Sequence, residues 1–201
     1  MWDTLQSDES IERTVAALRA NNIAAEVFDS TDAVKAHVIS MLPEGASVLT
    51  STSVTLDTIG ISNEINESAK YVSFKKQIFG VTDKIAHIAE RRRLVNPDYV
   101  IGSAHAITET GSIYVASGSG SQLAPYAYSA AHLILVVGAQ KIVKTDADAI
   151  RRIEEHCMPM EDVRAMKAYG RGTSFNKLLV IRKEGAPGRT SVIFVRKVIG
   201  F

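Results

Sequence analysis

Apolar residues recur along the chain in two patterns, helical spacing and short continuous runs. Ile11, Val15 and Leu18 follow helical spacing and predict an amphipathic helix over residues 10–21. Further helices are expected at 31–41, from 54 onward, around 81–88 and after 145. Thr145 and Asp148 resemble a capping box that opens the last of these helices. Short apolar runs predict strands at 25–28, 46–50, 70–74, 98–102, 112–116, 132–137, 178–181 and 192–198.

The alternation of strands and helices predicts an α/β fold with a doubly wound, mostly parallel sheet. Residues 132–137 are almost continuously apolar, which is typical of a central strand covered on both faces. The turn at 185–188 (GAPG) joins the last two strands and predicts a C-terminal antiparallel hairpin at the sheet edge. No repeat or linker divides the chain, so we expect one domain over 1–201, with 1–9 as a loose lead.

Composition narrows the function classes. The chain has 201 residues, a hydrophobic fraction of 46% and a formal net charge of +1, so it lacks the concentrated positive charge that nucleic-acid binding requires. The basic run Arg91, Arg92 and Arg93 is expected at the solvated end of a helix. No apolar run is long enough for a membrane span and no signal peptide is evident, so a cytoplasmic location is expected. Cys157 is the sole cysteine, so this chain alone holds neither an internal disulfide nor a cysteine-ligated iron–sulphur cluster.

A run of hydroxyl residues at 50–55 follows a predicted strand and precedes a predicted helix. In doubly wound folds, ligands lie outside the carboxyl ends of the strands. Ser51, Ser53 and Thr55 could therefore donate hydrogen bonds to a phosphate or a carboxylate. The alternative is that these hydroxyls only cap the helix and shape the turn.

Two further loops offer candidate chemistry. Glu109 lies between Thr108 and Gly111, where a carboxylate could act as a nucleophile or a general base, or could be an exposed turn residue. The loop at 117–122 (SGSGSQ), with Ser119 at its centre, could wrap an oxyanion with its backbone amides, or could serve only as a connection.

Basic side chains give the remaining candidates. His87, His105 and His132 are possible acids, bases or ligands, but their spacing matches no metal site, and a structural hydrogen-bonded role is the alternative for each. No metal is therefore expected. Lys141 follows the strand at 132–137 and could bind a substrate carboxylate, or could be a solvated turn residue.

Three segments together resemble the lactate-utilisation (LUD) domain family. Residues 53–60 (SVTLDTIG) resemble its S-x-T-L-x-x-I-G element, and residues 98–111 (DYVIGSAHAITETG) resemble its most specific signature. Residues 138–143 (GAQKIV) resemble its G-x-N-K-I-V element, with Gln140 in place of the usual asparagine. The resemblance extends from about Ile11 onward and includes the helix around 152–155.

The resemblance implies a fold like that of sugar-phosphate isomerases (NagB and RpiA) and coenzyme A transferases. It also implies a role in oxidising L-lactate to pyruvate, as a subunit without cofactors of its own beside partner subunits that carry iron–sulphur clusters. Two alternatives stay open: an independent enzyme of the acyl-transfer or isomerase type that uses Glu109, and a ligand-sensing module. In each case we expect Glu109 and Ser53 to lie around one small carboxylate or phosphorylated ligand.

Overall fold

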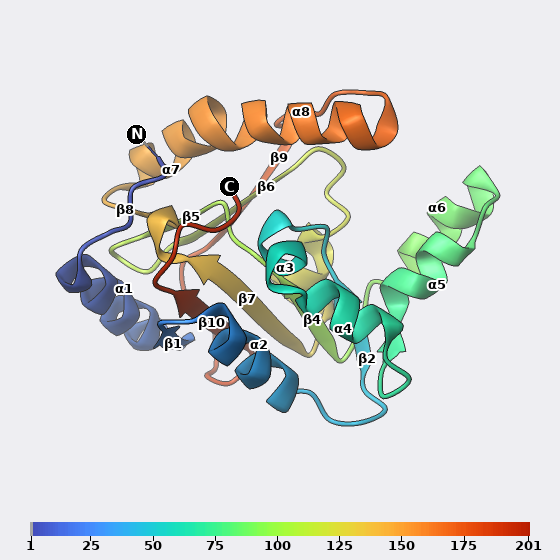
Figure 1. Cartoon of the computed structure of the whole chain (residues 1–201), viewed down its shortest axis with the longest axis horizontal. Helices are drawn as coiled ribbons and strands as arrows, with labels where there is room; N and C mark the ends of the chain where they lie inside the picture. The colour runs from blue at the N-terminus through green and yellow to red at the C-terminus, as the bar shows by residue number, and fades with distance from the viewer. Residues whose placement is uncertain (1) are drawn as a thin grey trace.

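A six-stranded sheet forms the centre of the computed structural model, which describes residues 2–201. Every neighbouring pair of its strands is parallel. This main sheet has the order β1 (Ala24–Phe28), β10 (Thr190–Val195), β7 (His132–Gly138), β4 (Tyr99–Gly102), β2 (Ser47–Thr50) and β3 (Val72–Ser73) (Figure 1). The doubly wound, mostly parallel α/β fold predicted from the sequence is confirmed.

A smaller mixed sheet packs beside the main one. Its order is β8 (Ile142–Val143), β5 (Ala106–Thr108), β6 (Ile113–Ser117) and β9 (Lys177–Ile181). β5 pairs in parallel with β8 and antiparallel with β6, and β6 pairs antiparallel with β9. The short strands β5 and β8 were not expected from the sequence, because each holds too few residues to show a period.

The predicted C-terminal hairpin is wrong, because β9 and β10 belong to different sheets. β10 lies between β1 and β7 and is parallel to both. Its side chains enter the core on both faces of the main sheet, with Val192 and Phe194 on one face and Ile193 and Val195 on the other. An edge hairpin would leave part of this apolar surface in water, whereas a central position buries all of it.

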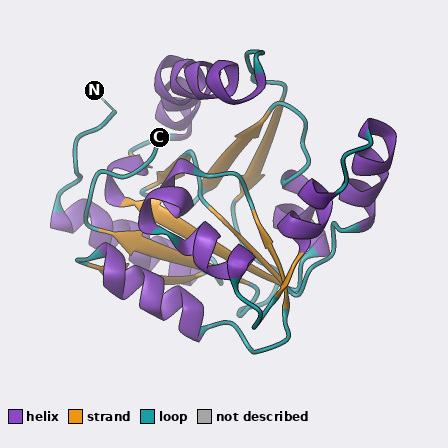
Figure 2. Ribbon diagram, turned by 45° about the vertical axis from the view of Figure 1, so that its right-hand side comes forward, coloured by secondary structure: helices purple, strands orange, loops and turns teal. Residues whose placement is uncertain are grey.

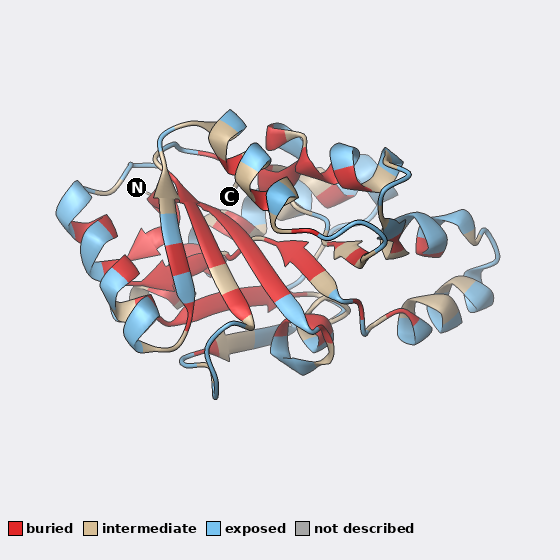
Figure 3. Ribbon diagram, turned by 90° about the horizontal axis from the view of Figure 1, so that it is seen from below, coloured by how far each residue is buried: buried red, intermediate tan, exposed pale blue. Residues whose placement is uncertain are grey.

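Helices and the second sheet cover the two faces of the main sheet (Figure 2). The first face packs against the second sheet and α1 (Asp8–Ala20). The opposite face packs against α2 (Thr31–Ser40), α3 (Val54–Ile59) and α4 (Ile61–Glu67). Figure 3 shows the strands between these layers as mostly buried.

A third group of helices covers the outer face of the second sheet. It consists of α7 (Asp146–Arg152), a π-helical turn (Ile153–Cys157) and α8 (Met158–Tyr169). The predicted capping box is confirmed, since Thr145 Oγ1 accepts from Asp148 N and Asp148 Oδ2 accepts from Thr145 N. Two residues of the N-terminal lead lie against these helices: Trp2 Nε1 donates to Glu155 at 3.3 Å, and Asp3 Oδ1 lies 3.1 Å from His156 Nε2.

An arm of two helices, α5 (Phe74–Gly80) and α6 (Lys84–Arg93), projects from the body (Figure 1). α6 buries none of its residues, and its last turn carries Arg91, Arg92 and Arg93 as expected. None of the helices within residues 2–201 combines the length and the apolar character that crossing a membrane requires.

Candidate functional site

The candidate site lies where the strand order of the main sheet changes direction. From β2 the chain places β3 on one side and β4 on the other, which makes the β2–β4 boundary a topological switch point. Ligands of open α/β sheets bind outside the carboxyl ends of strands at such points. Ser51 follows β2 here and Ser103 follows β4, while Lys141 comes shortly after the adjacent strand β7.

Lys141 is the centre of this site and is only 1% exposed. Its Nζ donates to Thr55 Oγ1 at 3.1 Å, to Ser103 Oγ at 3.3 Å and to the main-chain oxygen of Phe201 at 2.9 Å. Two of these acceptors are hydroxyls and the third is a main-chain oxygen of residue 201, and no aspartate or glutamate within residues 2–201 forms a salt bridge with this ammonium. Because Lys141 is buried, the solvated-turn interpretation of this residue is wrong. Thr55, Ser103, Lys141 and Phe201 are called the Lys141 cluster below.

A second buried cation lies close to the cluster. Burial and, to a smaller extent, the positive charge of Arg152 lower the pKa of Lys141 to about 7, against the opposing effects of Cys157 and Asp3. Arg152 is fully buried, and its Nη1 donates to the main-chain oxygen of His105 and, at 3.0 Å, to Cys157 Sγ. Its Nε and Nη2 have no hydrogen-bond partner among the described residues. Two buried cations therefore lie in this part of the interior, and an anion bound between them would reduce their repulsion.

His105 responds to the same charges. Burial, Lys141 and Arg152 together lower the pKa of this imidazole to about 3, so it is neutral near pH 7. Its Nδ1 accepts a hydrogen bond from Ala116 N at 3.2 Å, which assigns the proton of the neutral ring to Nε2. His105 thus adds a neutral donor and no further charge. His132 differs, since it is exposed at the start of β7 and its Nδ1 lies 3.3 Å from Gly188 O.

Residues 196–201, the covering segment, run across the Lys141 cluster. Gln140 Nε2 donates to the main-chain oxygens of Ile199 and Gly200, at 3.0 Å each, and Thr55 Oγ1 donates to Ile199 O at 3.4 Å. Gly200 has a φ of +59°, and a Cβ there would lie 2.2 Å from Thr55 Oγ1. Only glycine fits this approach without strain. Main-chain oxygens of the chain itself therefore occupy the donors of the site.

Ser51 and Ser53 have local structural partners. Ser51 Oγ accepts from Tyr126 Oη at 3.0 Å, and a Cβ on Gly102 would lie 1.5 Å from that hydroxyl, so the glycine makes room for the tyrosine. Burial raises the pKa of Tyr126 to about 12. Ser53 Oγ accepts from Leu56 N at 3.4 Å, which confirms the capping interpretation for this residue. Of the three predicted hydroxyls, only Thr55 contacts Lys141.

Glu109 lies apart from the Lys141 cluster. Its carboxylate accepts from Ser10 Oγ at 2.6 Å and from Arg13 Nε and Nη2 at 3.2 and 3.1 Å. These hydrogen bonds from Arg13 and Ser10 lower the pKa of Glu109. Both partners belong to α1, on the face of the main sheet opposite α3. The structure therefore does not bring Glu109 and Ser53 into one pocket, and the expected arrangement around a common ligand is absent within residues 2–201.

The remaining candidates from the sequence, Thr108, Gly111 and Ser119, have structural roles in turns. Thr108 Oγ1 accepts from Ser112 N at 3.0 Å, and Gly111 has a φ of +82°. A Cβ on Gly111 would lie 2.9 Å from the backbone of α1, so this turn packs directly on that helix. Ser119 binds Ser121 Oγ at 3.1 Å, and its main-chain oxygen accepts from Lys177 Nζ at 2.7 Å. None of these residues contacts Lys141.

The family model for the LUD domain matches residues 11–195. The chain belongs to the LUD domain family. A structurally similar protein is a DUF162 family protein from Deinococcus radiodurans, with a TM-score of 0.59 and 15% sequence identity over 96% of this chain and 99% of that one. This likeness concerns the fold. No curated protein matches the sequence.

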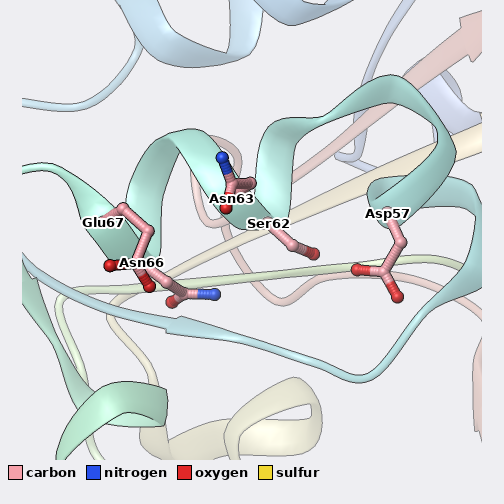
Figure 4. Close-up of a pocket in the computed structure, with 5 residues that line it drawn as sticks. All are labelled: Asp57, Ser62, Asn63, Asn66 and Glu67. Atoms are coloured by element: carbon pink, nitrogen blue, oxygen red, sulfur yellow. The ribbon is translucent and has the colours of Figure 1, made fainter.

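The LUD domain also carries a polar hollow of about 250 Å³ beside α3 and α4 (Figure 4). Ser62 Oγ is buried there without a hydrogen-bond partner. The hollow shares none of its lining residues with the Lys141 cluster, and they are Asp57, Ser62, Asn63, Asn66 and Glu67. Within residues 2–201, no three histidine, cysteine or acidic side chains come together as a metal site.

Three residues of the site were not selected from the sequence: Ser103, Gln140 and Arg152. Ser103 and Gln140 come directly after or close after strands β4 and β7, and this position is a signal that could have identified them. Arg152 has no such signal. It ends the helix α7, where an arginine is usually solvated, and only the packing of α7 on the second sheet buries it.

Proposed function

We propose that this LUD domain binds a small carboxylate at the Lys141 cluster and contributes to L-lactate utilisation as a component without iron–sulphur clusters. One observation carries the proposal: the ammonium of Lys141 is buried, and no aspartate or glutamate within residues 2–201 pairs with it. A carboxylate ligand would supply the missing negative charge, and Arg152 adds to the attraction.

Lactate and pyruvate suit the chemistry of this cluster. A carboxylate accepts hydrogen bonds from an ammonium, and the hydroxyls of Thr55 and Ser103 can bind the neighbouring hydroxyl or keto oxygen. The main-chain oxygen of Phe201 already accepts from Lys141 Nζ at 2.9 Å, so a ligand would take over this position. We therefore expect binding to displace the end of the covering segment.

Iron–sulphur partner subunits complete the proposal. Oxidation of lactate to pyruvate releases two electrons, and Cys157, the one cysteine of the chain, cannot hold a cluster by itself. Affinity purification of the tagged chain from its host should yield an iron-containing complex. Isolation of the chain without iron-containing partners under conditions that preserve complexes would contradict this part of the proposal.

An independent acyl transferase or isomerase using Glu109 has less support. Its carboxylate is held by Arg13 and Ser10, and a carboxylate engaged in this way is a weak nucleophile and a weak base. A ligand-sensing role would use the same Lys141 cluster. Ligand sensing and lactate utilisation therefore differ in the protein partner and not in the binding chemistry of the site.

The test is ligand binding by calorimetry and thermal shift, with L-lactate, pyruvate, a sugar phosphate and coenzyme A. A ligand that binds the native state at about 100 times its Kd adds roughly 2.7 kcal/mol of stability. We expect lactate or pyruvate to bind, Lys141→Met to abolish binding and Lys144→Met, a change at an exposed lysine three residues away, to leave it intact. Binding that survives Lys141→Met, or no binding of either acid, would refute the proposal.

A further inference from the structure

We propose that Lys141 forms a covalent imine with α-keto acids such as pyruvate, so that the site captures the carbonyl carbon of its ligand as well as its carboxylate. This inference rests on the proposed function, because it assigns a chemical class to the ligand of the same site. It is carried by the surroundings of Nζ, by the burial of Lys141 and by the second cation nearby.

Three acceptors surround Nζ of Lys141. An ammonium has three N–H groups, and here they are directed to Thr55 Oγ1, Ser103 Oγ and the main-chain oxygen of Phe201. A neutral amine has only two N–H groups and one lone pair. If the hydroxyls of Thr55 and Ser103 retain the two N–H groups, the lone pair is directed to the position that Phe201 O now occupies.

Burial raises the neutral fraction of the Lys141 amine above that of an exposed lysine. A lysine becomes nucleophilic when it is desolvated or lies beside another cation. Lys141 meets both conditions, since it is 1% exposed and interacts with Arg152. The charged or titratable groups that face Lys141 come from the N-terminal lead, the segment before β5, α7 and the π-helical turn, and they are Asp3, His105, Arg152, His156 and Cys157.

The imine forms by addition of Nζ to the keto carbon and loss of water. The lone pair of Nζ attacks the keto carbon, which forms a C–N bond and moves the carbonyl electron pair to oxygen. That oxygen then takes up the two protons that Nζ gives up and leaves as water, while the C=N bond forms. The hydroxyls of Thr55 and Ser103 lie 3.1 and 3.3 Å from Nζ and are placed to relay these protons. No oxidant or reductant is required.

Reductive trapping tests the inference. The full-length protein is incubated with pyruvate near pH 8 and reduced with sodium borohydride, and its peptides are mapped by mass spectrometry. Reduction converts an imine into a stable secondary amine, which adds one carboxyethyl group to the lysine. Burial gives Lys141 a neutral fraction at least about a hundredfold above that of an ordinary exposed lysine, so we expect its labelling to exceed that of Lys144 by at least about tenfold.

Two controls make the outcome decisive. L-lactate has no keto group, so it should compete with pyruvate for the site and leave no adduct. Lys141→Arg keeps the positive charge and should lose the label, and peptide mapping of the unaltered protein gives an answer even if this variant does not fold. Equal labelling of Lys141 and Lys144 would overturn the inference, as would calorimetric binding of pyruvate without an adduct. The latter result would leave the proposed function intact, whereas a failure of both acids to bind would refute both.

Discussion

Replacing Lys141 with methionine tests the electrostatics on which the site depends. Methionine has a similar length and no charge, so Lys141→Met removes the buried ammonium with little change in packing. Replacement of a buried charge by an apolar side chain of similar volume is often neutral or stabilising. We expect the variant to be at least as stable as the unaltered protein near pH 7, although it loses three hydrogen bonds.

The magnitude follows from the pKa of Lys141. Its fall from 10.5 to about 7 means that the unfolded chain binds more protons than the folded one between these two pH values. The stability of the unaltered protein therefore rises with pH across this window, and the penalty is constant below it. At 1.36 kcal/mol per pKa unit, the penalty is about 4 kcal/mol at pH 7 and about 1 kcal/mol at pH 10.

Urea unfolding of both proteins from pH 6 to pH 10 measures this effect. The free energy of unfolding of the unaltered protein should gain about 3 kcal/mol relative to Lys141→Met between pH 7 and pH 10. Lys144→Met, at an exposed position, should follow the unaltered protein throughout. A constant difference between the unaltered protein and Lys141→Met over this range would refute the lowered pKa of the buried Lys141.

Four further substitutions test other parts of the structure. Gly102→Ala should lower the free energy of unfolding by about 2 kcal/mol or more, and Tyr126→Phe in the same chain should recover part of this loss, since the new Cβ meets Tyr126 Oη at 1.5 Å. Glu109→Gln should leave lactate affinity within about twofold, because its carboxylate does not contact the Lys141 cluster. A large loss of lactate binding in Glu109→Gln would instead restore Glu109 as a site residue. The same variant should lose less stability in acid than the unaltered protein. The lowered pKa of Glu109 stabilises the folded state, and this stabilisation disappears as the pH falls through that pKa. Thr145→Ala should cost about 1 kcal/mol in thermal or urea unfolding, and an unchanged stability would contradict a role for the capping box.

Sequence periodicity was sufficient to predict the longer helices and strands. The strand at 132–137 and the helix at 10–21 correspond to β7 and α1 within about two residues, because their apolar spacing extends over several turns or alternations. The capping box at Thr145 was predictable because it depends only on residues three apart. Short strands such as β5 and β8 carry no such pattern, and the partners of β9 and β10 are decided by packing between distant segments.

Features of the candidate site also fall into those that the sequence predicts and those that depend on tertiary structure. The sequence by itself determined the family motifs, the absence of a cluster-binding cysteine set and the position of a lysine shortly after a central strand. Only the tertiary structure decided that Lys141 is buried against Thr55, Ser103 and Phe201, which lie 86, 38 and 60 residues away in the chain. It also decided that Glu109 binds Arg13 of α1. The physical reason is that burial and charge pairing depend on which segments the fold brings together, and local spacing carries no information about those distances.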